Sequence, residues 1–139
     1  MSLPPQKFRE IVFQLLYSQD VTETLPESIP FMMEALKVTR RHVAEAESKM
    51  RQIVAQLEKV DAEIEKVSTA YSFDRISKVE KTVIRLGIYE FLHEALPLKV
   101  MLAEAMRLCR KFGTPEGVHF VNAILDEICA KSGEKPLPV

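Results

Sequence analysis

The stretch that decides the fold runs from Phe73 to Ile128 and contains three blocks, FDRISKVEKTVIRLGIYEF (73–91), LPLKVMLAEAMRLCRKFG (96–113) and GVHFVNAILDEI (117–128). In each block the apolar residues recur at the three- and four-residue steps that are typical of an amphipathic helix. The blocks are separated by Leu96-Pro97 and by Gly113-Thr114-Pro115, and Pro and Gly are the residues that most often end helices. The stretch therefore predicts three consecutive helices joined by short turns.

The first of these helices, expected over 77–92, has apolar residues on nearly its whole circumference beyond Val83. A helix that is apolar all round lies in the centre of a protein. Gly87 in its interior costs about 1 kcal/mol relative to Ala, and close approach of another helix backbone would account for that cost. The next two helices are expected over 99–112 and 116–131. We therefore expect a bundle built around 77–92.

Helices are also expected before Phe73. One follows Pro4-Pro5, since prolines suit a first helical turn, and it ends by Thr22 to Pro26. Its apolar stripe consists of Phe8, Ile11, Val12, Leu15 and Leu16. A short helix is expected over 30–37, and two consecutive helices are expected over 39–57 and 61–70.

The middle of the chain permits a second interpretation. From Val43 to Val67 the apolar residues alternate steps of three and four without a break, which is the heptad pattern of a coiled coil. Two features argue against a coiled coil. The apolar stripe is wider at Ile53-Val54, and Asp61 could cap a new helix. We favour two consecutive helices that pack on the rest of the chain, and a helical coiled-coil adaptor stays as the alternative.

The composition favours helices over sheets, because the 139 residues include only 4 Gly and 7% aromatic residues. One domain over 1–132 and a flexible tail over 133–139 are expected. The net charge of −1 excludes a global basic field for nucleic acid. No apolar run approaches the length of about 18 residues that a membrane span needs, so we expect a cytoplasmic protein without membrane contacts.

No catalytic constellation is present in the sequence. His42, His93 and His119 are scattered, and none lies beside a Cys or Ser as a nucleophile would require. The spacing of Cys109 and Cys129 matches no metal or redox motif, which indicates buried, reduced thiols. A Gly-rich phosphate loop is also missing. We therefore expect no enzyme, no cofactor and no metal site.

Two places carry residues suited to single-stranded RNA. Lys7 and Arg9 begin a helix that also carries Tyr17, and basic groups near an aromatic ring that can stack on a base are typical of such binding. The second place is the turn at 112–116, where the helix start offers free N–H groups to a phosphate. It leads into His119, Phe120 and Asn122. Core packing explains Phe120 equally well, and a helix–helix hydrogen bond explains Asn122.

Taken in order, these residues resemble the NusB family of transcription antitermination factors. The resemblance rests on RExxxQLLYS (9–18), RISKVEKTVIRLGIYEF (75–91), LPLKVMLAEAMRLCRKFG (96–113) and HFVNAILDEI (119–128). It covers roughly half of the chain, and residues 21–70 match by helical pattern only. It implies an all-α, NusB-like compact bundle of about seven helices in two small packed subdomains.

The resemblance also implies a function. NusB proteins pair with NusE, a small-subunit ribosomal protein, and the pair binds boxA RNA and acts on the elongating RNA polymerase with other Nus factors. A homodimer is a further state that the family allows. The RNA-facing residues implied here are Lys7, Arg9, Tyr17, Glu116, His119, Phe120 and Asn122. The partner-facing residues implied are Arg75, Glu80 and Arg85.

The sequence departs from the family pattern at two sites. The arginine-rich N-terminus is reduced to Lys7 and Arg9, which predicts a shallow dependence of RNA binding on salt. Ala123 replaces the glycine of Phe-Val-Asn-Gly, which could crowd a close backbone approach. The runner-up function is the RNA-binding domain found in front of ribosomal RNA cytosine methyltransferases. That activity would need a downstream domain with an S-adenosylmethionine site, which these residues do not include.

Overall fold

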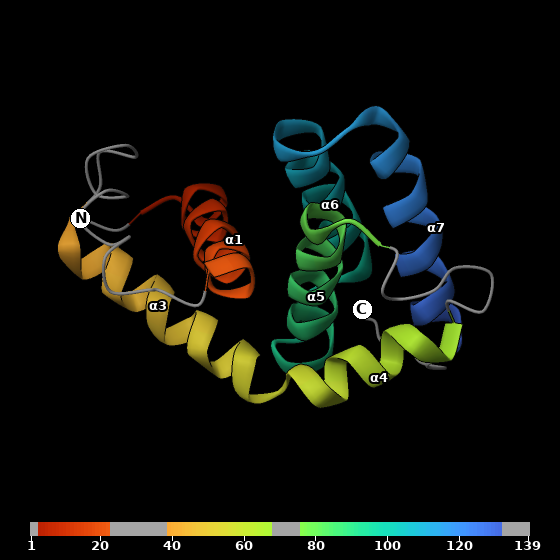
Figure 1. The fold of residues 1–139 in the computed structure, drawn as a ribbon, viewed down its shortest axis with the longest axis horizontal. Helices are drawn as coiled ribbons and strands as arrows, with labels where there is room; N and C mark the ends of the chain where they lie inside the picture. Colours follow the sequence, from red (N-terminus) through yellow and green to blue (C-terminus); the bar gives the residue numbers. More distant parts are fainter. Residues whose placement is uncertain (1–2, 23–38, 68–75, 132–139) are drawn as a thin grey trace. The chain divides into compact units, whose positions relative to one another are not determined.

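The computed structural model describes residues 3–22, 39–67 and 76–131, and these ranges contain six α-helices and no strand (Figure 1). In the labels of Figure 1 the helices are α1 (Pro5–Thr22), α3 (Arg40–Ala55), α4 (Leu57–Val67), α5 (Lys78–His93), α6 (Leu98–Phe112) and α7 (Pro115–Lys131). The expectation of an all-α fold is confirmed for these residues. The helix expected over 30–37, the end of the one expected over 61–70 and the tail at 133–139 lie outside them.

The chain divides into two compact units, Met1–Ala55 and Gln56–Val139, and each is described by itself. In the first unit α1 packs against α3. The residues that form its buried stripes are Ile11, Val12, Leu15 and Leu16 of α1 and Val43, Ala46, Met50 and Ile53 of α3. Both sets follow steps of three and four, which is why two amphipathic helices form this unit. The expectation of a single domain over 1–132 stays a prediction.

The heptad-like stripe belongs to two helices and not to one. α3 ends at Ala55, Gln56 forms a turn, and α4 begins at Leu57. Two consecutive helices were expected, but the break was placed a few residues too late. Val60 and Ile64 of α4 are fully buried within the chain, so this part of the stripe is covered without a second molecule. These features overturn the coiled-coil adaptor interpretation.

α5 forms the centre of the second unit, where it packs against α4, α6 and α7. Every residue from Thr82 to Phe91 is buried, as expected for a helix that is apolar nearly all round. A Cβ added at Gly87 would lie 3.1 Å from the Met101 sulfur and 3.8 Å from a methyl of Leu125. The close approach expected at Gly87 therefore exists, but it is made by side chains of α6 and α7 and not by a helix backbone.

The ends of α5 and α6 are determined by local residues. Ser77 caps α5, since its hydroxyl accepts a hydrogen bond of 3.2 Å from the N–H of Glu80. Beyond His93 the chain turns through Ala95, whose φ is 54°, and the Leu96 N–H donates to the Glu90 carbonyl at 3.1 Å. α6 then starts after Pro97 and ends before Gly113, which confirms both predicted joints. None of the helices in the described ranges is long and apolar enough to cross a bilayer.

Candidate nucleic-acid interface

α1 carries the first set of predicted RNA-facing residues, all within the first unit. Lys7, Arg9 and Tyr17 are half-buried. At about 100° and 1.5 Å per residue, Lys7 and Arg9 lie about 80° to either side of Tyr17 and about 12–15 Å closer to the helix start. The Tyr17 ring stacks on buried Phe13, with ring centres 6.2 Å apart and an angle of 15° between the planes. Because Phe13 holds the ring in place, stacking of a base on Tyr17 costs little side-chain entropy.

Phe8, between the two basic residues, faces the other way. The Lys49 ammonium of α3 lies over its ring, 5.9 Å from the ring centre. Phe8 and Tyr17 are nine residues apart, which places them on opposite sides of a helix. The aromatic side chain that interrupts the family's arginine cluster therefore contributes to α1–α3 packing.

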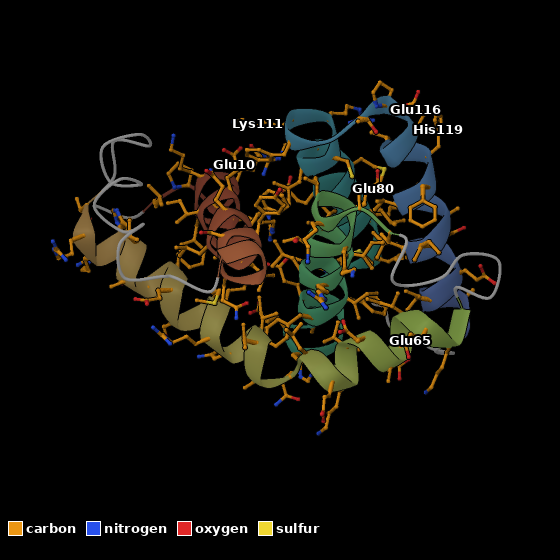
Figure 2. The ribbon with its side chains drawn as sticks, viewed as in Figure 1. Glu10, Glu65, Glu80, Lys111, Glu116 and His119 are labelled. Atoms are coloured by element: carbon orange, nitrogen blue, oxygen red, sulfur yellow. The ribbon has the colours of Figure 1, made fainter. Side chains whose placement is uncertain are left out.

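The start of α7 carries the second set. Thr114 caps this helix, because its hydroxyl accepts a hydrogen bond of 3.1 Å from the N–H of Gly117. Glu116, His119 and Asn122 follow at three-residue steps and are all exposed, so they share one face of α7. Phe120 is half-buried beside that face. Figure 2 shows Glu116 and His119 on the first turns of α7.

Glu80 lies against this same turn. It belongs to the first turn of α5 and is half-buried. A Cβ added at Gly117 would collide with its carboxylate, and the carboxyl carbon would be 3.0 Å away. Figure 2 shows Glu80 beside the first turn of α7. The structure therefore brings a predicted partner residue into contact with the predicted RNA-facing turn, at a glycine that the sequence analysis had not singled out.

The charges at this helix start disfavour the phosphate site that the sequence suggested. Glu80 lies against Gly117, Glu116 is in the first turn, and the Thr114 hydroxyl already accepts from the Gly117 N–H. A phosphate there would meet two carboxylates. Hydrogen bonding of an RNA base by His119 and Asn122 fits this surface better. Positive charge next to the turn comes from exposed Arg110 and Lys111 in the last turn of α6.

Cys109 is buried beneath the turn. Burial and, to a smaller extent, the nearby Glu80 carboxylate raise the pKa of its thiol to about 11. The thiol therefore stays protonated at neutral pH, and its Sγ lies 3.9 Å from the Gly117 carbonyl oxygen, to which it donates. A protonated, buried thiol is a poor nucleophile.

The remaining predicted partner residues differ in their surroundings. Arg85 is only 8% exposed, and its guanidinium donates two hydrogen bonds of 2.9 Å to the carboxylate of Asp61 on α4. Such a two-fold pairing fixes the side chain within the second unit. Arg75 lies outside the described residues. Within the ranges that the structure describes, no three His, Cys, Asp or Glu side chains gather as metal ligands.

These features define a helical protein with two candidate RNA-facing surfaces. Comparison with known proteins identifies its family. The model of the NusB family matches residues 6–130. The chain is 36% identical over 132 residues to the transcription antitermination protein NusB of Anaeromyxobacter sp. strain Fw109-5, covering 94% of this chain and 92% of that one. It is 34% identical over 131 residues to the NusB of Chlamydia pneumoniae, covering 93% and 82%.

Solved structures agree with the sequence relatives. A structure of NusB from T. maritima superimposes with a TM-score of 0.77 at 28% identity and covers 94% of each chain. A structure of the antitermination factors NusB and NusE in complex with double-stranded RNA has a TM-score of 0.73 at 24% identity, and covers 88% of this chain and 93% of that one. The chain belongs to the NusB family of transcription antitermination proteins.

Family membership confirms three of the expectations from the sequence. The resemblance to NusB extends from the quoted blocks to nearly the whole chain, including the middle that matched by pattern only. The NusB-like fold is confirmed by the superposition on the T. maritima protein. The family consists of non-enzymatic antitermination factors, so the chain acts by binding and not by catalysis. The roles of individual site residues stay predictions.

Proposed function

We propose that this chain binds boxA-type single-stranded RNA together with NusE, and that it acts in the cytoplasm on the RNA polymerase elongation complex with other Nus factors. The observation that carries the proposal is the family match over residues 6–130, which includes both sets of RNA-facing residues. The relative that superimposes with a TM-score of 0.73 was solved as a complex of NusB and NusE with double-stranded RNA. Such a complex would promote read-through and processing of ribosomal RNA transcripts, which is the role that the resemblance to the NusB family implies.

Each surface has its own part in RNA binding. Tyr17 provides a ring for base stacking, and Lys7 and Arg9 provide charges for phosphates on either side of it. His119 and Asn122 provide hydrogen bonds to base edges, with Phe120 beside them. Glu116 accepts hydrogen bonds only, so its contacts would be base amino groups or ribose hydroxyls. These surfaces carry few basic residues, so a partner protein would supply further positive charge for RNA binding.

NusE is proposed to bind the second unit at the first turn of α5. Glu80 is a half-buried glutamate in that turn, and it is the acidic member of the three predicted partner-facing residues. Arg85 contributes by holding α5 on α4 through Asp61. Arg75 is kept in the proposed surface on the resemblance alone.

The experiment is a titration of fluorescently labelled boxA RNA with this chain, with and without NusE, followed by anisotropy over a series of salt concentrations. A permuted RNA of the same length and composition is the control. We expect tighter binding of boxA than of the permuted RNA, and tighter binding with NusE than without. With two basic contacts, Lys7 and Arg9, the slope of log K against log salt for the chain alone should be about −1.4. Equal binding of both RNAs would contradict the proposal.

A further inference from the structure

Gly117 is held by groups from three parts of the second unit. Its N–H donates to the Thr114 hydroxyl at 3.1 Å, and its carbonyl oxygen accepts from the Cys109 thiol at 3.9 Å. The third side, where a side chain would project, is occupied by the Glu80 carboxylate. Of these groups only the Glu80 carboxylate is charged, and its side chain is half-exposed, so it can also form an ion pair with a binding partner.

The neighbouring glycine has a similar environment. A Cβ added at Gly113 would lie 3.4 Å from the Val79 side chain and 3.0 Å from the Cys109 carbonyl oxygen. Val79 and Glu80 are consecutive residues in the first turn of α5, and Ser77 fixes that turn by accepting from the N–H of Glu80. The first turn of α5 therefore lies against Gly113, between α6 and α7, and against Gly117 in the first turn of α7.

We propose that Glu80 is a positioning residue for the RNA-facing start of α7, and that a protein partner which binds the Glu80 carboxylate alters RNA affinity through Gly117. This inference rests on the proposed function, since it takes His119 and its neighbours to contact RNA. When the carboxylate turns from Gly117 toward a partner, the contact that sets the first turn of α7 changes. Linkage then requires that RNA changes partner affinity by the same factor.

A role for Glu80 in partner contact alone predicts something different. In that case the Glu80 carboxylate, which is the end of a flexible side chain, would move aside for a Cβ at Gly117, and Gly117→Ala would leave RNA affinity nearly unchanged. The contact with Glu80 predicts a loss of RNA affinity instead. It also predicts that this loss depends on the side chain at position 80.

The test is a double-mutant cycle with Gly117→Ala, Glu80→Ala and the combined variant, measured by boxA RNA anisotropy with saturating NusE. We expect Gly117→Ala to weaken RNA binding about tenfold and Glu80→Ala to weaken it as well, and the combined variant to lose less than the product of the two single losses, because both changes disturb the same contact. Glu65→Ala is the matched control, since Glu65 is an exposed glutamate on α4 of the same unit and its loss changes the net charge equally (Figure 2). Single losses that multiply in the combined variant would show that the two residues act independently and would overturn the inference.

The link to the partner is tested with Glu80→Gln, which keeps the shape of the side chain and removes its charge. The enhancement of RNA affinity by NusE should fall severalfold in Glu80→Gln, whereas in Glu65→Ala it should match that of the parent chain. An unchanged enhancement would overturn the link between the two sites.

A readout that does not need RNA separates this inference from the proposed function. The backbone amide signal of His119 in the free protein should shift in Glu80→Ala, because position 80 lies on another helix and acts on His119 only through the contact with Gly117, and it should not shift in Glu65→Ala. A parent chain that binds no RNA with or without NusE would refute the proposed function, and the His119 signal would then decide the positioning role. An unshifted His119 signal in Glu80→Ala would overturn that role.

Discussion

Arg85 and Asp61, 24 positions apart in the sequence, are joined by two hydrogen bonds of 2.9 Å that connect α5 to α4. The guanidinium is nearly buried, with a side chain 9% exposed, and the carboxylate is 23% exposed. The pair explains why an arginine is tolerated on a helix whose other residues from Thr82 to Phe91 are also buried.

Removal of the acidic partner should therefore be costly. Asp61→Ala leaves the Arg85 charge buried and unpaired, and we expect the free energy of unfolding to fall by about 2–4 kcal/mol in urea titrations. Glu63→Ala on the same helix breaks the exposed pair with Lys66 and should change it by less than about 0.5 kcal/mol. Equal effects of the two variants would contradict the structural role of the Arg85–Asp61 pair.

A substitution at Ala95, two residues beyond the end of α5, should stabilise the protein. Ala95 has a φ of 54°, in the left-handed region that disfavours side chains. Ala95→Gly should raise the free energy of unfolding by about 0.5–1 kcal/mol, because the relief of strain exceeds the added entropy of the unfolded chain. Ala103→Gly, at an exposed position inside α6, should lower it by a similar amount. Thermal unfolding of the two variants gives the comparison.

The central position of α5 can be tested with two leucines of the same helix. Leu86 is 1% exposed and Leu92 is 44% exposed. Leu86→Ala should cost about 2–5 kcal/mol, since it leaves a cavity. Leu92→Ala should change stability by less than about 1 kcal/mol. Similar losses at both positions, measured by chemical denaturation, would contradict the arrangement of α5.

Tyr17 is expected to bind RNA through its ring. Tyr17→Ala should weaken boxA RNA binding by about 1–3 kcal/mol, the range found for loss of one base-stacking contact. Tyr17→Phe keeps the stack on Phe13 and should retain most of the affinity. Circular dichroism provides the control, because helix content should be the same in both variants. Full RNA affinity in Tyr17→Ala would remove Tyr17 from the site.

Cys109 should make stability fall at alkaline pH. Its pKa is about 11 in the folded protein and 9.0 in the reference state, so the unfolded chain loses its proton first as the pH rises. The stabilisation of the folded state by the protonated thiol is complete below pH 9 and is lost as the pH rises toward 11. The unfolding free energy of the parent chain should therefore fall more steeply over this interval than that of Cys109→Ala. Parallel curves would show that the thiol is not shielded from water.

Much of the candidate site could be predicted from the sequence, but its internal contacts could not. The residues Tyr17, Glu116, His119 and Asn122 were selected by their type and by the family resemblance, and the structure gives each of them some exposure. The contact between Glu80 and Gly117 was missed, because it joins residues on different helices. Two glycines four positions apart, at 113 and 117, were the only local indication of it.

The sequence by itself determined that the chain is helical and where the joints at Leu96-Pro97 and Gly113 lie. Apolar residues at three- and four-residue steps, the Leu96-Pro97 joint and Gly113 are local features, and local features set where a helix begins and ends. The tertiary structure decided which charges are paired and which residues meet. The break at Gln56 divides one apolar stripe between two helices. Asp61 pairs with Arg85, and the Glu80 carboxylate lies against Gly117. Such contacts arise between residues far apart in the chain, and only packing brings them together.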